Sequence, residues 1–83
     1  MKKNSTLNEV RLNEEVKIKK INCTGNVKRR ILDLGMIEGT KIKPVLKSPL
    51  GDPTAYEVRG SLISLREEES KNIEINYRNI EIV

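Results

Sequence analysis

The stretch RILDLGMIEGT, residues 30–40, carries most of the information about the fold of this 83-residue chain. Apolar residues recur at the spacing i, i+4 and i+7, which stacks them on one face of a helix. They are Val27, Ile31 and Leu34. Gly35 follows at once and can adopt the left-handed conformation that ends a helix without steric cost. We therefore predict a short helix over residues 26–34.

Alternating apolar and polar residues before and after this helix predict five short strands. The expected ranges are 15–21, 41–47, 55–59, 62–65 and 73–77. Pro44 cannot donate a hydrogen bond to a neighbouring strand, so it predicts a sheet edge or a bulge. The dipeptide Gly60-Ser61 favours a type II′ hairpin, and residues 67–71 can form one helical turn before the last strand. Strand count and spacing predict a mainly β fold, a small, partly open SH3-like barrel with one helix between its first two strands.

The chain is short enough for one domain only. Residues 1–14 are polar and predict a flexible N-terminal segment. We place the domain at residues 15–77 and a C-terminal tail at residues 78–83.

Composition excludes many kinds of chemistry. The chain has no His, so it has no imidazole base, no Ser–His pair and no His metal ligand. Cys23 is the only cysteine, which rules out an intramolecular disulfide and a zinc site built from four Cys or His. The acidic run at residues 67–69 is more typical of a solvated helix face than of a metal site. We expect no enzymatic activity, no cofactor and no metal site.

Charge and apolar content bear on partners and location. The net charge is +4, which suits an acidic partner, although a merely soluble surface explains it as well. Two Tyr without Phe or Trp make a poor stacking platform, so we expect no nucleic acid. The start of the chain has no apolar run typical of a signal peptide, and no apolar stretch is long enough to span a membrane. With one unpaired Cys, these features predict a cytoplasmic protein.

Three motifs in a fixed order resemble the FeoA family of bacterial ferrous iron transport. They are RILDLGMIEGT at residues 30–40, PLGDP at residues 49–53 and SLISLR at residues 61–66. The resemblance covers residues 15–77 and implies an SH3-like domain. It also implies a cytosolic accessory protein that binds and modulates FeoB, the transporter that forms the permeation path and carries a cytosolic G-protein domain.

The candidate partner-binding residues come from a loop and a basic stretch. Two prolines stiffen the loop, so an apolar residue on it can act as a contact anchor, and Asp52 can brace the turn through neighbouring amides. The candidates are Leu50, Gly51, Asp52, Lys17, Lys19, Lys20, Lys28, Arg29 and Arg30. The basic stretch can meet an acidic face of FeoB, such as its G domain, or the anionic membrane surface beside it, and a plain solvated surface stays the alternative. Residues with a structural role in turns are Gly35, Gly39, Pro49, Pro53 and Gly60.

An alternative function belongs to a different class. The same SH3-like module resembles the C-terminal domain of metal-dependent transcriptional repressors. There it follows a helix-turn-helix and a dimerisation region, for which 83 residues leave no room. We therefore expect the transport accessory rather than the regulatory domain.

Overall fold

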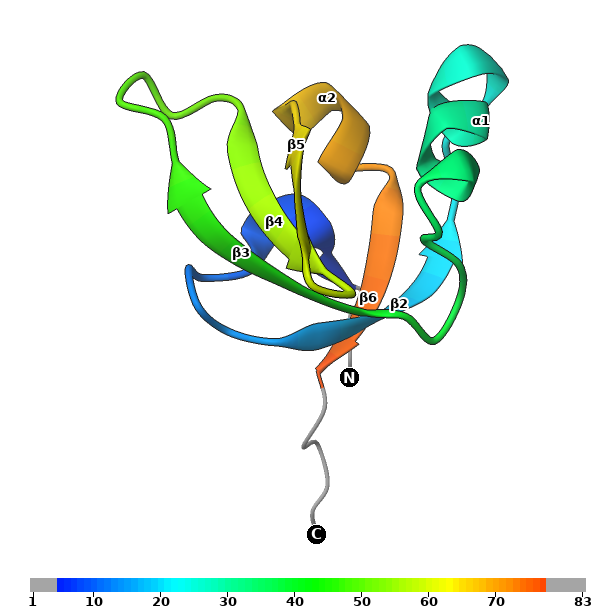
Figure 1. The fold of residues 1–83 in the computed structure, drawn as a ribbon, viewed down its shortest axis with the longest axis horizontal. Coiled ribbons are helices and arrows are strands. Elements are labelled where there is room, and N and C mark those ends of the chain that lie inside the picture. Colours follow the sequence, from blue (N-terminus) through cyan, green and yellow to red (C-terminus); the bar gives the residue numbers. More distant parts are fainter. Residues whose placement is uncertain (1–4, 78–83) are drawn as a thin grey trace, which may run out of the picture.

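The computed structural model describes residues 5–77 and shows short strands with two α-helices (Figure 1). The first part holds β1 (Ser5–Thr6), a 3-10 helix η1 (Leu7–Glu9), β2 (Val16–Ile21) and α1 (Gly25–Asp33). The second part holds β3 (Lys41–Lys47), β4 (Thr54–Val58), β5 (Ser61–Leu65), α2 (Glu67–Ser70) and β6 (Ile73–Tyr77). All five predicted strands and both predicted helical segments are present, each within one residue of its expected bounds.

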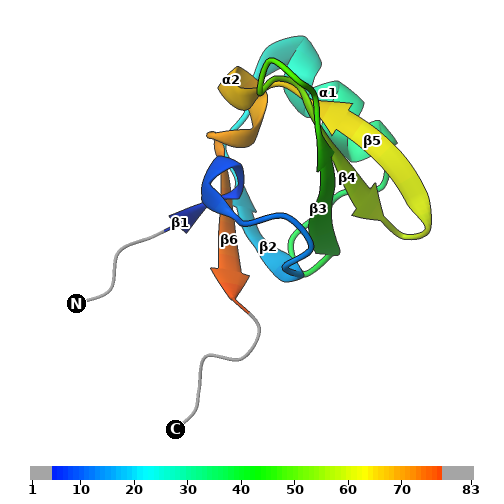
Figure 2. The same cartoon turned by 90° about the vertical axis from the view of Figure 1, so that its left-hand side faces the viewer.

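The strands form one antiparallel sheet in the order β1-β6-β2-β3-β4-β5. β3 joins its two halves, since Lys41 and Ile42 pair with β2 whereas the following residues pair with β4. Figure 2 shows the sheet curling between these halves, while β1 and β5 stay at its two ends. This arrangement confirms the mainly β, partly open SH3-like barrel with a helix between β2 and β3.

The end of α1 explains why Gly35 is needed. The Gly35 N–H bonds to the Leu32 carbonyl at 2.9 Å and the Met36 N–H bonds to the Ile31 carbonyl at 3.2 Å. These two bonds form a Schellman motif, whose C′ residue must be left-handed, and Gly35 has φ +88°. The prediction for Leu34 was wrong: it sits at the C-cap, where the helix has ended, and is 41% exposed.

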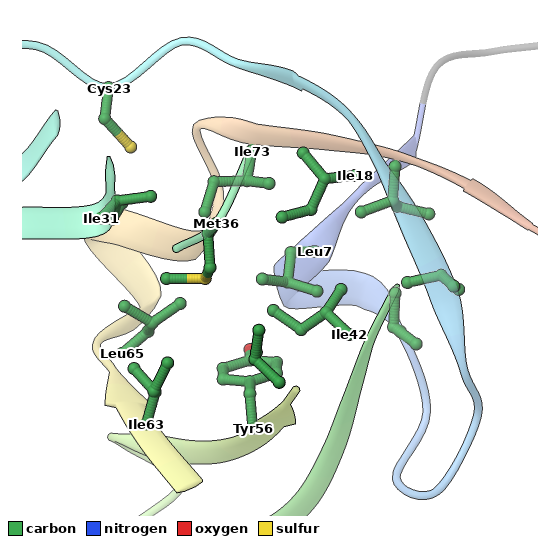
Figure 3. Close-up of a cluster of buried hydrophobic side chains, with 14 residues drawn as sticks. Leu7, Ile18, Cys23, Ile31, Met36, Ile42, Tyr56, Ile63, Leu65 and Ile73 are labelled. Atoms are coloured by element: carbon green, nitrogen blue, oxygen red, sulfur yellow. The ribbon is translucent and has the colours of Figure 1, made fainter. Parts of the chain in front are cut away.

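The core is mostly aliphatic and lies between the sheet and the helices (Figure 3). Ile31 and Met36 from the α1 region meet Leu65 and Tyr56 from the β4–β5 hairpin. Leu7 of η1 is fully buried in the same cluster.

The burial of Leu7 and Val10 corrects the predicted domain boundary. Both belong to the core, and β1 pairs with β6. The domain therefore begins before residue 15, because these two apolar side chains belong to its common core. The predicted C-terminal tail, 78–83, lies outside the described residues, as do residues 1–4.

The β4–β5 hairpin turns one residue earlier than predicted. Val58 pairs with Ser61, so the two-residue turn is Arg59-Gly60. Both have positive φ, +53° for Arg59 and +84° for Gly60, which makes a type I′ turn instead of type II′. A shift of register between Pro44 and Leu46 confirms the bulge that Pro44 predicts.

Candidate partner-binding surface

Three hydrogen bonds within the loop between β3 and β4 hold its conformation. The Gly51 N–H donates to the Ser48 carbonyl at 2.8 Å, with Pro49 in the position it favours in a type I turn. The Ser48 hydroxyl donates to the Asp52 carbonyl at 2.7 Å, and the Ser48 N–H donates to the Pro53 carbonyl at 3.1 Å. These bonds close the base and the tip of the loop, as a stiff loop requires.

Leu50 stands at the tip of this loop and is 94% exposed. It is the most exposed of the large apolar residues in the described part of the chain. An apolar side chain held out on a closed turn costs little conformational entropy when a partner covers it. The position therefore suits a contact anchor.

Asp52 does not brace its own turn, contrary to expectation. Its Oδ1 accepts a hydrogen bond of 2.8 Å from the Glu67 N–H, at the start of α2. The first N–H groups of a helix have no partner inside the helix, and a carboxylate there also meets the positive end of the helix dipole. Asp52 thus ties the loop to α2.

Arg30, which lies on α1, also contacts α2. Its Nη2 lies 2.8 Å from Oε2 of Glu69, and Oε1 of Glu69 accepts the Arg66 N–H at 3.0 Å. Burial by itself would raise the pKa of Glu69, whose side chain is 15% exposed, but the Arg66 N–H and the Arg30 guanidinium lower it below its ordinary value. Two of the predicted candidates, Asp52 and Arg30, therefore both contact α2. This helix was not predicted to be part of the partner-binding surface.

The other basic candidates are exposed but do not form one patch with the loop. They are Lys17, Lys19, Lys20, Lys28 and Arg29. Lys17 pairs with Lys41 at the start of β3, whereas Leu50 follows its end. Seven strand residues separate these points by roughly 20 Å. Lys28 and Arg29 also lie on α1, but their side chains are turned by about 200° and 100° around the helix from that of Arg30.

Cys23 carries a free thiol. It is buried, and burial together with the negative charge of Glu69 raises the pKa of its thiol. In residues 5–77, no three Cys, Asp or Glu side chains are grouped so that they could hold a metal ion. No helix of this part of the chain is long and apolar enough to cross a membrane.

Comparison with known proteins decides the family. The sequence model of the FeoA domain family matches residues 5–77 of this chain. The chain belongs to the FeoA family. The match begins where the structure places β1, ten residues before the domain start predicted from the sequence.

Two relatives of this FeoA chain differ in length. A putative Fe(2+) transport protein A of Campylobacter jejuni is 31% identical over 71 residues, which is 86% of this chain and 96% of that protein. A protein of Porphyromonas gingivalis is 32% identical over 69 residues, or 83% of this chain. The latter is a fusion of Fe(2+) transport protein A with the Fe(2+) transporter FeoB, and the match spans 8% of its length.

Solved structures agree on the FeoA fold. The FeoA-like protein of Clostridium acetobutylicum has a TM-score of 0.82 and 37% identity, with 100% of this chain and 96% of that chain covered. FeoA of Stenotrophomonas maltophilia, an SH3 domain protein solved with zinc, has a TM-score of 0.75 and 25% identity, covering 86% and 88% of the two chains. A manganese-dependent transcriptional repressor has a TM-score of 0.80 but 9% identity, covering 93% of this chain and 43% of the repressor, which shows a shared fold alone.

Proposed function

We propose that this FeoA-family protein is a cytoplasmic accessory of ferrous iron uptake that binds the FeoB transporter and modulates it. One observation carries the proposal: a relative with 32% identity has the FeoA module and FeoB in one chain. Fusion keeps two modules at a high effective concentration, which is useful when they contact each other. The absence of His and the burial of Cys23 favour binding over catalysis.

The proposed contact surface is the loop with Leu50, Gly51 and Asp52, together with α2 and the basic end of α1. Leu50 would enter an apolar pocket of the partner, since a few well-packed and fully desolvated side chains carry most of the binding energy of an interface. Lys28 and Arg29 would face acidic residues around that pocket. We assign the cytosolic G domain of FeoB as the occupant, because this surface combines an apolar anchor with positive charge.

A titration by NMR tests this assignment. The isotope-labelled protein would be titrated with the soluble G domain of FeoB from the same organism. We expect shifts at the amides of residues 50–52 and 67–70, and a loss of affinity of about tenfold or more for Leu50→Ser. Leu12→Ser is the matched control, because Leu12 is an exposed leucine outside the loop and should not alter binding.

The outcomes separate the possible contacts. Shifts restricted to Lys17, Lys19 and Lys20, seen only with vesicles of anionic lipid, would replace the G domain by the membrane surface. Binding that is equal for Leu50→Ser and the wild type would remove the loop from the interface. Failure of both the G domain and full-length FeoB to bind would overturn the function and favour the regulatory alternative.

A further inference from the structure

The two edges of the sheet differ in a way that calls for an explanation. Natural proteins protect sheet edges with very short strands, charged side chains, prolines or bulges. β1, at one edge, has only two residues. β5, at the other edge, has five residues, Ser61–Leu65, none of which is charged, and it pairs with β4 without a bulge. In a chain with 34% charged residues, β5 is therefore an unprotected edge.

The backbone of β5 presents hydrogen-bonding groups to the outside. In a hairpin with a two-residue turn, the residues that flank the turn, Val58 and Ser61, exchange hydrogen bonds. Every second residue of β5 after Ser61, namely Ile63 and Leu65, also exchanges hydrogen bonds with β4. The N–H and C=O of Leu62 and Ser64 consequently point away from β4. Within residues 5–77, no hydrogen bond reaches these groups. Figure 2 shows β5 at the outer margin of the sheet.

The outer face beside this edge combines uncharged residues with one ion pair. Leu62 is 69% exposed, although it belongs to a regular strand. Across the sheet, one row of side chains is Leu46, Ala55 and Ser64, and the next row is Lys43, Glu57 and Leu62. The two charges of the second row already form an ion pair of 3.5 Å.

We propose that two copies of this protein pair through β5 in an antiparallel manner, with Ile63 at the two-fold axis. Leu62 of each copy then lies opposite Ser64 of the other, and both residues have outward N–H and C=O groups. Each of these two pairs exchanges two hydrogen bonds, so all the free edge groups of Leu62 and Ser64 are satisfied. Such an isologous interface closes after two copies and leaves no free edge at β5.

The side-chain rows explain why a second copy fits better than an unrelated strand. In this pairing, the row ending in Leu62 continues into Ser64, Ala55 and Leu46 of the second copy, so the exposed leucines of both copies share one face. No like charges come opposite each other in the strand pair. The basic residues Lys17, Lys19 and Lys20 lie on β2, three strands away in the sheet, so they stay away from the paired edges.

The strand pair is short, so the dimer should form reversibly and depend on protein concentration. An interface of two five-residue strands lies at the small end of specific protein interfaces. We expect the wild type to be monomeric at micromolar concentration and increasingly dimeric towards about 1 mM. Its amide shifts at Leu62 and Ser64 should move with concentration more than those of β1.

Sedimentation velocity of the full chain between these concentrations is the decisive experiment, with two variants and a control. Ser64→Pro removes an outward N–H without touching a bond to β4, and Leu62→Lys places a charge at the edge. Each should weaken association by about tenfold or more, since every change acts twice in a symmetric dimer. Leu12→Lys is the control, because Leu12 is 45% exposed but lies in the segment before β2, outside these side-chain rows, and it should dimerise as the wild type does.

Amide spectra of the dilute variants establish that each one is folded, so that a loss of association is not caused by unfolding. A wild type that stays monomeric with constant shifts up to about 1 mM would overturn the proposal. Dimerisation that Ser64→Pro and Leu62→Lys leave unchanged would overturn it too, by moving the interface elsewhere. A monomer whose binding to the FeoB G domain is weakened by both variants would assign the edge to a strand of FeoB instead of a second copy.

Discussion

The β4–β5 hairpin and the loop between β3 and β4 are neighbours along one sheet, yet they are held in place by different forces. The hairpin is anchored by apolar side chains, with Tyr56, Ile63 and Leu65 in the core. The loop has its large apolar residue, Leu50, in solvent and is anchored by hydrogen bonds of Ser48 and Asp52. Apolar burial contributes more to stability than single polar contacts near the surface.

This difference separates stability from recognition. The loop can change its exposed side chains at little cost to the fold, because its conformation depends on the backbone bonds and on Asp52. The hairpin cannot, since its inward side chains fill the common core. What it offers to a partner is its outer edge, where main-chain groups of Leu62 and Ser64 are free within the described part of the chain.

Truncation of a buried side chain in the hairpin should cause the largest loss of folding stability. Leu65 is almost completely buried, so Leu65→Ala removes packed methyl groups and leaves a cavity. We expect the free energy of unfolding to fall by about 2–5 kcal/mol, measured by urea denaturation followed by circular dichroism. Leu62→Ala in the same strand is the control and should change it by less than about 0.5 kcal/mol, since Leu62 is exposed. Similar losses for the two variants would contradict the apolar anchoring of the hairpin.

Truncation in the loop should have a smaller and local effect. Asp52→Ala leaves the Glu67 N–H without its acceptor, and we expect a loss of about 1 kcal/mol, the usual effect of removing a helix cap. The Glu67 amide should exchange faster with solvent and shift in the NMR spectrum. Asp52→Asn keeps an acceptor oxygen and should recover most of the loss. An unchanged Glu67 amide in Asp52→Ala would show that the loop is not tied to α2.

The elements of the fold could be predicted because they depend on local periodicity. The strand patterns and the Gly35 stop signal needed no information from distant residues. The hairpin turn was misplaced because Arg59 takes a positive φ, which non-glycine residues rarely adopt. The buried role of Leu7 was missed because it lies in a polar segment whose burial depends on β6, more than 60 residues away.

The candidate partner-binding surface could be predicted only in part, because some of its contacts join residues that are far apart in the sequence. The exposed Leu50 follows from two prolines in a short loop, and that is a local signal. The bond from Glu67 to Asp52 joins residues 15 positions apart, and the Arg30–Glu69 pair joins residues 39 apart. Neither has a local signal, although an acidic run at a helix start indicates that Glu69 can cap α2.

The smallest expected effect depends on pH and tests the contact between α1 and α2. The folded-state pKa of Glu69 is lowered below its ordinary value of 4.5, so its charge stabilises the fold above that pH. As the pH falls through the lowered pKa, Glu69 becomes protonated and this contribution disappears. Glu69→Gln should therefore be less stable than the wild type near pH 7, and the two should converge well below pH 4.5.

The size of this difference follows from the exposure of the pair. The Arg30 side chain is 45% exposed, so solvent screens its attraction to Glu69, and we expect only about 0.5–1 kcal/mol at neutral pH. Urea unfolding at several pH values measures it, with Glu68→Gln as a matched control, because Glu68 forms no ion pair within residues 5–77. A difference that persists at low pH would mean that the Gln side chain disturbs packing instead of removing a charge. A difference absent at every pH would place Arg30 among the solvated basic residues and would remove its ion pair from the contacts that stabilise α2.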